Sequence, residues 1–250
     1  MTGSAISISV TGIFIPPEYE DFDRYPKFDA TIDFFIRIFD NNYEYNINKE
    51  IIIVDVTEKI FFLIKQYGGY LTSKKAKENG IENKTLQYMT KRGLIERAAH
   101  GLYIDADIFP DPFYITQYRC PRGIFSNETA LFLHNFSDRD PIRLMMTIPS
   151  GWNSQMLTDD NMQFFYSKPK IMELGVCEVY TPSGLKVKVY DIERTLCDCL
   201  RNMDKLDRDI VLTALKRYIK SKDRDNAKLL EYASVLKIRD TVYRYLEVLA

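Results

Sequence analysis

The 250-residue chain has few of the residues that build metal and redox centres. It contains four cysteines and two histidines, and their spacing matches no Cys/His zinc pattern. Cys197 and Cys199 would project about 200° apart on a helix, too far round the axis to hold one ion together. The phosphate-binding sequences GxGxxG and GxxxxGK[ST] are also missing. We therefore expect no metal, no cofactor, no small-molecule ligand and no catalytic residues.

Long hydrophobic runs are missing as well. No uninterrupted apolar stretch reaches the roughly 18 residues that a membrane-spanning helix needs. Residues 1–15 are apolar, but no basic residue precedes them, and the first one in the chain is Arg24. A secretory signal would begin with such a residue. These features predict a cytoplasmic protein that is not bound to a membrane and whose cysteines are reduced.

The chain carries no net excess of charge that would indicate its partners. Lys and Arg number 34 against 35 Asp and Glu, for a net charge of -1. The acidic surplus lies in residues 1–50, which hold four basic and nine acidic residues, whereas residues 51–110 and 111–250 are each +2. With 46% apolar residues the chain is typical of globular proteins. We treat residues 1–50 as an N-terminal extension of unknown role.

Residues 51–110 combine helical spacing with glycine at the expected helix ends. The expected elements are helices over 55–67, 73–79 and 84–92, then strands over 94–98 and 102–104. Thr72 or Ser73 could cap the second helix, and Asn83 the third. Ala99-His100-Gly101 would form the turn between the strands. Helix, short helix, helix and hairpin in this order predict a winged helix-turn-helix.

The third helix of such a domain can enter the major groove of DNA, whose base edges carry the sequence. Amides suit adenine edges, and basic side chains suit guanine edges or phosphates. The expected DNA-binding residues are Lys74, Lys75, Asn83, Lys84, Thr85, Gln87, Tyr88, Lys91, Arg92, Arg97 and His100. Because some winged helices bind only proteins, a protein-binding module is the alternative.

Residues 111–250 predict a mixed α/β domain that ends in a bundle-like helical segment, so the fold class is α+β. Extended segments are expected over 113–120, 123–125, 144–148, 163–166, 176–181 and 185–190, and helices over 128–135, 192–203, 209–220, 225–236 and 239–249. Asp191 would cap the helix that follows it. Lys186, Lys188 and Tyr190 would form the wet face of the last strand.

Two charged groups in this domain could have a function. Asp191, Glu193 and Asp198, beside Lys188 and Arg194, could serve a metal-dependent nuclease if they met at one site. The second group is basic and could contact nucleic acid or an acidic partner, or be a solvated helix pair. It comprises Lys205, Arg208, Lys216, Arg217, Lys220, Lys222, Arg224 and Lys228.

Three segments resemble one family. They are GGYLTSKKAKENGIENKTLQYMTKRGLIERAAHGLYI (68–104), SNETALFLHNFSDRDPIRLMMTIPSGWN (126–153) and KVYDIERTLCDCLRNM (188–203). In this order they resemble AbiEi antitoxins of abortive-infection systems. The resemblance covers roughly residues 55–250. It departs from the family pattern at residues 1–50 and at the wing, where His100 stands in place of a frequent arginine.

The resemblance implies an antitoxin of a type IV toxin–antitoxin system in phage defence. Such a protein is not an enzyme. It represses its own operon by binding inverted repeats in the promoter, and it counteracts a nucleotidyltransferase toxin (AbiEii-like) without a required stable complex. The basic group at 205–228 would be the antitoxic surface. The alternatives are a stand-alone winged-helix transcriptional regulator and a DNA-targeted nuclease.

Overall fold

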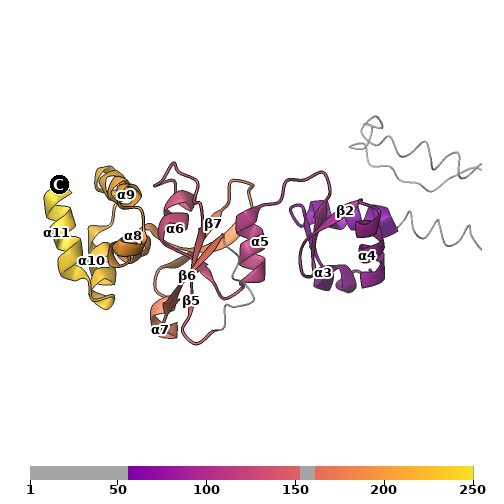
Figure 1. The fold of residues 1–250 in the computed structure, drawn as a ribbon, viewed down its shortest axis with the longest axis horizontal. Coiled ribbons are helices and arrows are strands. Elements are labelled where there is room, and N and C mark those ends of the chain that lie inside the picture. The colour runs from indigo at the N-terminus through magenta and orange to yellow at the C-terminus, as the bar shows by residue number, and fades with distance from the viewer. Residues whose placement is uncertain (1–55, 153–160, 250) are drawn as a thin grey trace, which may run out of the picture. The chain divides into compact units, whose positions relative to one another are not determined.

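A computed structural model describes residues 56–152 and 161–249 of the chain (Figure 1). The expected extension at residues 1–50 lies outside these described residues. Residues 59–250 form one compact unit, to which the following description applies. In the described residues no helix has the length and apolar character needed to cross a bilayer.

The first part of the described chain has the helix and strand order of a winged helix-turn-helix. A helix at residues 56–66 is followed by β1 (Tyr70–Thr72), α3 (Ser73–Glu78), α4 (Asn83–Lys91), β2 (Ile95–Ala99) and β3 (Leu102–Asp105). The strands form an antiparallel sheet in the order β1-β3-β2. Ile64, Leu71, Leu86 and Ile95 are each at most 1% exposed and pack the helices on the sheet. Burial of such side chains supplies most of the stability of short helices like α3.

The second part contains a five-stranded mixed sheet. Its elements are α5 (Pro112–Arg119), β4 (Ile124–Phe125), α6 (Asn127–Leu133), β5 (Leu144–Pro149), β6 (Met162–Ser167), α7 (Pro169–Met172), β7 (Val176–Tyr180) and β8 (Lys186–Tyr190). The strand order is β6-β5-β4-β8-β7, with β4–β8 and β5–β6 parallel and the other pairs antiparallel. Phe113, Phe125, Met146 and Val189 share one core on the α5 and α6 side. The fold is therefore of the expected α+β class.

The chain ends in a group of packed helices. These are α8 (Ile192–Arg201), a 3-10 turn (Met203–Lys205), α9 (Arg208–Lys220), α10 (Asn226–Val235) and α11 (Arg239–Leu249), which lie together in Figure 1 (orange to yellow). Leu196 and Cys199 of α8 pack with Leu215 of α9 and Leu229 of α10 in a second core. Asp191 caps α8, as expected, by accepting a hydrogen bond from Arg194 N at 2.9 Å.

Two expectations for the part with the five-stranded sheet were wrong. Residues 113–119 of the segment expected to be extended over 113–120 are helical, because Asp111 caps α5 and Pro112 occupies its first turn, where proline needs no N–H donor. Tyr190 was expected on the wet face of β8, yet it is fully buried. Its hydroxyl donates to Met172 O at 3.1 Å, and the guanidinium of Arg194 lies 4.2 Å from its ring centroid.

Candidate nucleic-acid interface

The outer face of α4 gathers polar side chains on a rigid support. Leu86 and Met89 anchor the helix because both are fully buried. Thr85 and Thr90 are half-buried between the two faces, and the residues at the remaining positions project outward. The exposed members of the expected set on α4 and at its end are Asn83, Lys84, Gln87, Tyr88, Lys91 and Arg92. The guanidinium of Arg92 lies 5.7 Å from the ring centroid of Tyr88, a cation–π distance.

Asn83 does not cap α4, contrary to the expectation. Glu82 occupies the cap position, with φ -78° and ψ 149°, and it makes no side-chain capping bond. The helix begins one residue earlier than expected, directly after a turn in which Ile81 is 3% exposed. Asn83 is therefore the first residue of the helix, and its side chain is exposed.

The short helix α3 presents two expected phosphate contacts. Thr72 caps it, since its hydroxyl accepts from Lys75 N at 3.1 Å. Lys74 and Lys75 are both exposed. Lys75 Nζ also lies 3.8 Å from a Glu78 carboxylate oxygen and 5.0 Å from the ring centroid of Tyr67, so part of its charge is already compensated within the domain.

The wing is the turn between β2 and β3. Its two expected contact residues are exposed and joined to each other, with Arg97 Nη2 2.7 Å from His100 Nδ1. A guanidinium can only donate, so Nδ1 is the acceptor in this arrangement. The pairing register shifts between Arg97 and Ala99, a bulge that redirects the end of β2. Gly101 completes the turn with φ 73°.

The charge of this surface differs from that of the chain as a whole. Residues 73–97, from the start of α3 into β2, hold seven basic and three acidic residues and are net +4. One of the acids, Glu78, is in contact with Lys75. A local positive field of this kind attracts a polyanion and makes its binding salt-dependent.

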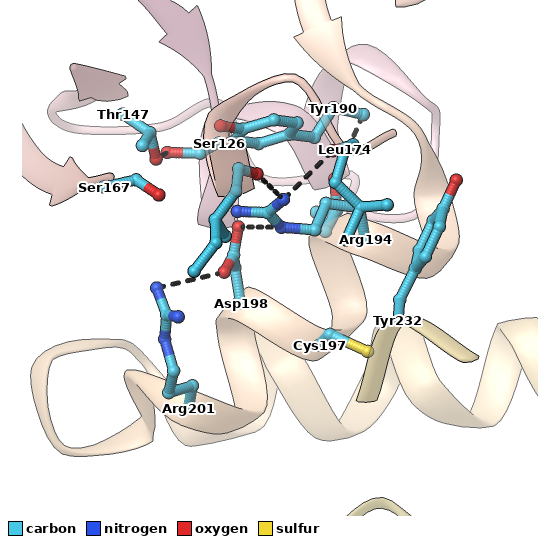
Figure 2. Close-up of polar contacts among 12 residues, drawn as sticks. Ser126, Thr147, Ser167, Leu174, Tyr190, Arg194, Cys197, Asp198, Arg201 and Tyr232 are labelled. Atoms are coloured by element: carbon cyan, nitrogen blue, oxygen red, sulfur yellow. Dashed lines mark hydrogen bonds and ion pairs between the residues drawn. The ribbon is translucent and has the colours of Figure 1, made fainter. Parts of the chain in front are cut away.

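The acids that could have formed a nuclease site are used inside the fold. Arg194 Nε donates to Asp198 Oδ2 at 2.9 Å, and Arg201 Nη2 lies 3.3 Å from the other oxygen of that carboxylate (Figure 2). Arg194 Nη1 donates to Ile171 O and Leu174 O. Burial raises the pKa of Asp198 above its usual value although the two arginines lower it. This group holds α8 against the α7 segment.

Asp191 and Glu193 share a different cation. Lys228 Nζ, from α10, lies 3.1 Å from Asp191 Oδ2 and 3.2 Å from Glu193 Oε2. Partial burial opposes the charge of Lys228, but the two carboxylates outweigh burial and raise its pKa. Glu193 and Arg194 thus face different partners. In the part of the chain that the structure describes, no three His, Cys, Asp or Glu side chains gather where they could hold a metal ion.

The cysteines are poor nucleophiles in this fold. Burial raises the pKa of Cys120 to about 11 and that of Cys197 to about 12, and it raises the pKa of Cys199 strongly. Thiols with such pKa values stay protonated at neutral pH and react slowly. His134 Nε2 is hydrogen-bonded to Tyr190 O at 2.7 Å, so its ring serves the packing of α6 on β8.

The basic group at residues 205–228 is only partly a free surface. Arg217 pairs with Asp138, Arg224 donates to Ile219 O, and Lys228 is held by the two carboxylates of α8. The remaining five members are exposed on or beside α9: Lys205, Arg208, Lys216, Lys220 and Lys222.

A residue outside the expected set reaches the wing. Tyr118, on α5, donates from its hydroxyl to Gly101 O at 3.1 Å. The sequence pattern did not predict this contact, because it indicated that residues 113–120 are extended. Asp111 followed by Pro112 was the available signal, because this pair often begins a helix.

The comparisons with known proteins agree with this geometry. Residues 58–104 match the family model described as "Transcriptional regulator, AbiEi antitoxin". None of the curated proteins matches the chain. Beyond residue 104, the resemblance stays a prediction.

Among solved structures, the fold is similar to that of the RV2827C protein from Mycobacterium tuberculosis. The TM-score is 0.53 at 10% sequence identity, over 75% of this chain and 79% of that chain. At this identity the similarity concerns the fold alone. By sequence, residues 58–104, which contain the helix-turn-helix and its wing, match the AbiEi antitoxin family of transcriptional regulators.

Proposed function

We propose that this protein is an antitoxin that also represses its own operon. It binds inverted repeats in its promoter through residues 51–110, and residues 111–250 counteract a nucleotidyltransferase toxin without a required stable complex. The observation that carries the proposal is the exposed polar face of α4, within a segment that matches a family of antitoxins and transcriptional regulators. The protein acts by binding and is not an enzyme.

In this proposal α4 lies in the major groove of each half-site. Asn83 and Gln87 face adenine edges, and Lys84, Lys91 and Arg92 face guanine edges or phosphates. Thr85 and Tyr88 complete the contact. Lys74 and Lys75 bind the phosphate backbone beside the groove, and the wing, with Arg97 and His100, touches the adjacent groove. The exposure of these side chains, apart from half-buried Thr85, supports this assignment.

The antitoxic surface is proposed to be the exposed part of the basic group. Lys216 and Lys220 lie four residues apart on the outer face of α9, and Arg208, Lys205 and Lys222 flank them. A positive surface of this kind fits an acidic partner or the nucleic acid on which a nucleotidyltransferase toxin acts. Lys228, Arg217 and Arg224 lie beside this surface and are engaged by partners within the chain.

Binding to DNA is tested by fluorescence anisotropy of the full chain on the DNA upstream of its own gene, against a scrambled duplex. We expect selectivity of about a thousandfold or more, and affinity that falls steeply as salt is added. Equal and weak binding to both duplexes would instead indicate a protein-interaction module. That result would remove the repressor role but leave the antitoxin role open.

The antitoxin role is tested by growth rescue when a neighbouring nucleotidyltransferase is expressed. The variant Lys216→Gln/Lys220→Gln should lose rescue yet repress normally, and the matched variant Lys74→Gln/Lys84→Gln should do the reverse. The opposite assignment would overturn the division of roles between the two parts of the chain. If the wild-type chain rescues nothing, the protein is a stand-alone regulator.

A further inference from the structure

The wing turn is held by two hydrogen bonds to one carbonyl. Gly101 O accepts from Ser73 N at 2.8 Å and from the Tyr118 hydroxyl at 3.1 Å. The first bond comes from the start of α3, inside the winged helix. The second comes from α5, which begins after the segment that matches the family model. The position of the wing therefore depends on an element outside the winged helix.

Helix α5 shows a different face to each of the two sheets. Tyr114, Ile115 and Tyr118 pack with Tyr70 in the cluster of the three-stranded sheet, and the rings of Tyr70 and Tyr114 are 4.6 Å apart. Phe113, one residue before Tyr114, belongs to the core of the five-stranded sheet. The helix is therefore packed against both sheets, so a shift of α5 relative to one sheet would also disturb its packing on the other.

The start of α5 is fixed by one buried carboxylate. Asp111 is 2% exposed, and its Oδ1 accepts from Phe113 N and Tyr114 N at 2.9 and 3.1 Å. Its Oδ2 accepts from the hydroxyl of Thr181, which follows β7, and its N–H donates to the Tyr70 hydroxyl at 2.6 Å. One residue thus joins β1, α5 and the β7–β8 turn.

The end of α5 is fixed by one amide. Gln117 Nε2 donates to Cys120 O and Gly123 O, each at 3.0 Å, and Gln117 Oε1 accepts from Lys188 N at 2.9 Å. Strand β4 pairs with β8 only at Phe125 and Val189, so the amide of Gln117 takes the place of a strand partner for Lys188. The position of Tyr118, the next residue, is therefore fixed relative to the five-stranded sheet.

We infer that α5 is part of the DNA-binding device and that Tyr118 is a positioning residue for the wing. Its hydroxyl ties the turn that follows His100 to a helix set by the five-stranded sheet. It thereby determines how the wing is placed relative to α4. The inference rests on the proposed DNA binding and adds that the groove contact of the wing depends on a residue that does not itself touch DNA.

The test compares Tyr118→Phe with Tyr114→Phe in the full chain. Each change removes one hydroxyl from the same face of α5 and keeps the ring. Loss of one hydrogen bond corresponds to about three- to tenfold weaker DNA binding for Tyr118→Phe, and we expect no change for Tyr114→Phe. Both variants should stay folded and unfold cooperatively because the ring packing is retained, with Tyr118→Phe melting only slightly lower because it loses one hydrogen bond.

Hydroxyl-radical footprinting distinguishes positioning from general weakening. Tyr118→Phe should lose protection at the groove touched by the wing and keep protection at the bases covered by α4. The variant Thr181→Val, which releases Asp111 from the β7–β8 turn, should change the same wing footprint. Affinity and footprints of Tyr118→Phe equal to those of Tyr114→Phe would overturn the inference. Failure of the wild-type chain to bind its upstream DNA selectively would instead overturn the proposed DNA binding, and the inference with it.

Discussion

The winged helix and the α8–α10 region use the same charged residue types in opposite ways. On α4, Lys84 and Lys91 project into solvent beside exposed amides. On α8, Arg194 is 0% exposed, and its charge is met by Asp198 within the fold. A charge is available to a partner only if the fold has not already compensated it. The difference therefore separates the exposed surface that we propose binds DNA from a buried cluster that stabilises the fold, and the following predictions test that separation.

The largest effect is expected at the buried arginine. Arg194→Met leaves the Asp198 carboxylate without its hydrogen-bonded partner, and breaking a buried ion pair in this way costs about 3–5 kcal/mol. Urea denaturation would measure the loss. Arg201→Met is the matched control, because Arg201 pairs with the same carboxylate but is 33% exposed, so we expect at most about 1 kcal/mol there. Equal losses in the two variants would mean that burial does not determine how much an ion pair contributes to the free energy of unfolding.

The next effect is expected on DNA binding and not on stability. Gln87→Ala removes an amide that is proposed to read a base, and a good base contact contributes about 1–3 kcal/mol of discrimination. We expect relaxed selectivity at one position of each half-site and an unchanged free energy of unfolding. Gln66→Ala, at an exposed glutamine on the first helix, is the control. Anisotropy on duplexes with single base changes would measure both variants.

A smaller effect distinguishes the two histidines. Burial lowers the pKa of His134 below its usual 6.5, although its hydrogen bond to Tyr190 O opposes the shift. Between the folded and unfolded pKa values the unfolded chain binds more protons, so stability is present above pH 6.5 and declines as the pH falls below it. Unfolding of His134→Gln should lose this part of the pH dependence. His100→Gln, on the exposed wing, should keep it, and a loss there would contradict the assignment.

The smallest effect is expected at an exposed ion pair. Arg139 Nη1 lies 3.1 Å from Asp207 Oδ2, and their side chains are 67% and 43% exposed. Exposed pairs contribute about 0–1 kcal/mol and are screened by salt. Thermal denaturation of Arg139→Gln at low and high salt should show a change below about 1 kcal/mol that shrinks with salt. A larger loss of stability would mean that this exposed pair contributes as much as the buried Arg194–Asp198 pair.

Local signals were sufficient for the winged helix. Glycine after the expected helices, the Thr72 cap and the short apolar runs around Gly101 predicted its elements to within a few residues. These signals act over one helical turn or one hairpin, so they are visible in the sequence. The exposed face of α4 follows from the same spacing once Leu86 and Met89 are placed inside. The three-helix order over 209–249 was predicted for the same reason.

The tertiary structure decided what depends on contacts far apart in the chain. Residues 113–120 are rich in aromatic and β-branched side chains and resemble a strand, yet they form α5 because the helix buries one face against each sheet. Spacing cannot show that Lys228 meets Asp191 and Glu193, or that Tyr118 meets Gly101. The sequence by itself determined which segments become helices and turns in the winged helix. Packing decided which charges remain available for binding, because only the assembled fold brings distant partners within hydrogen-bond distance.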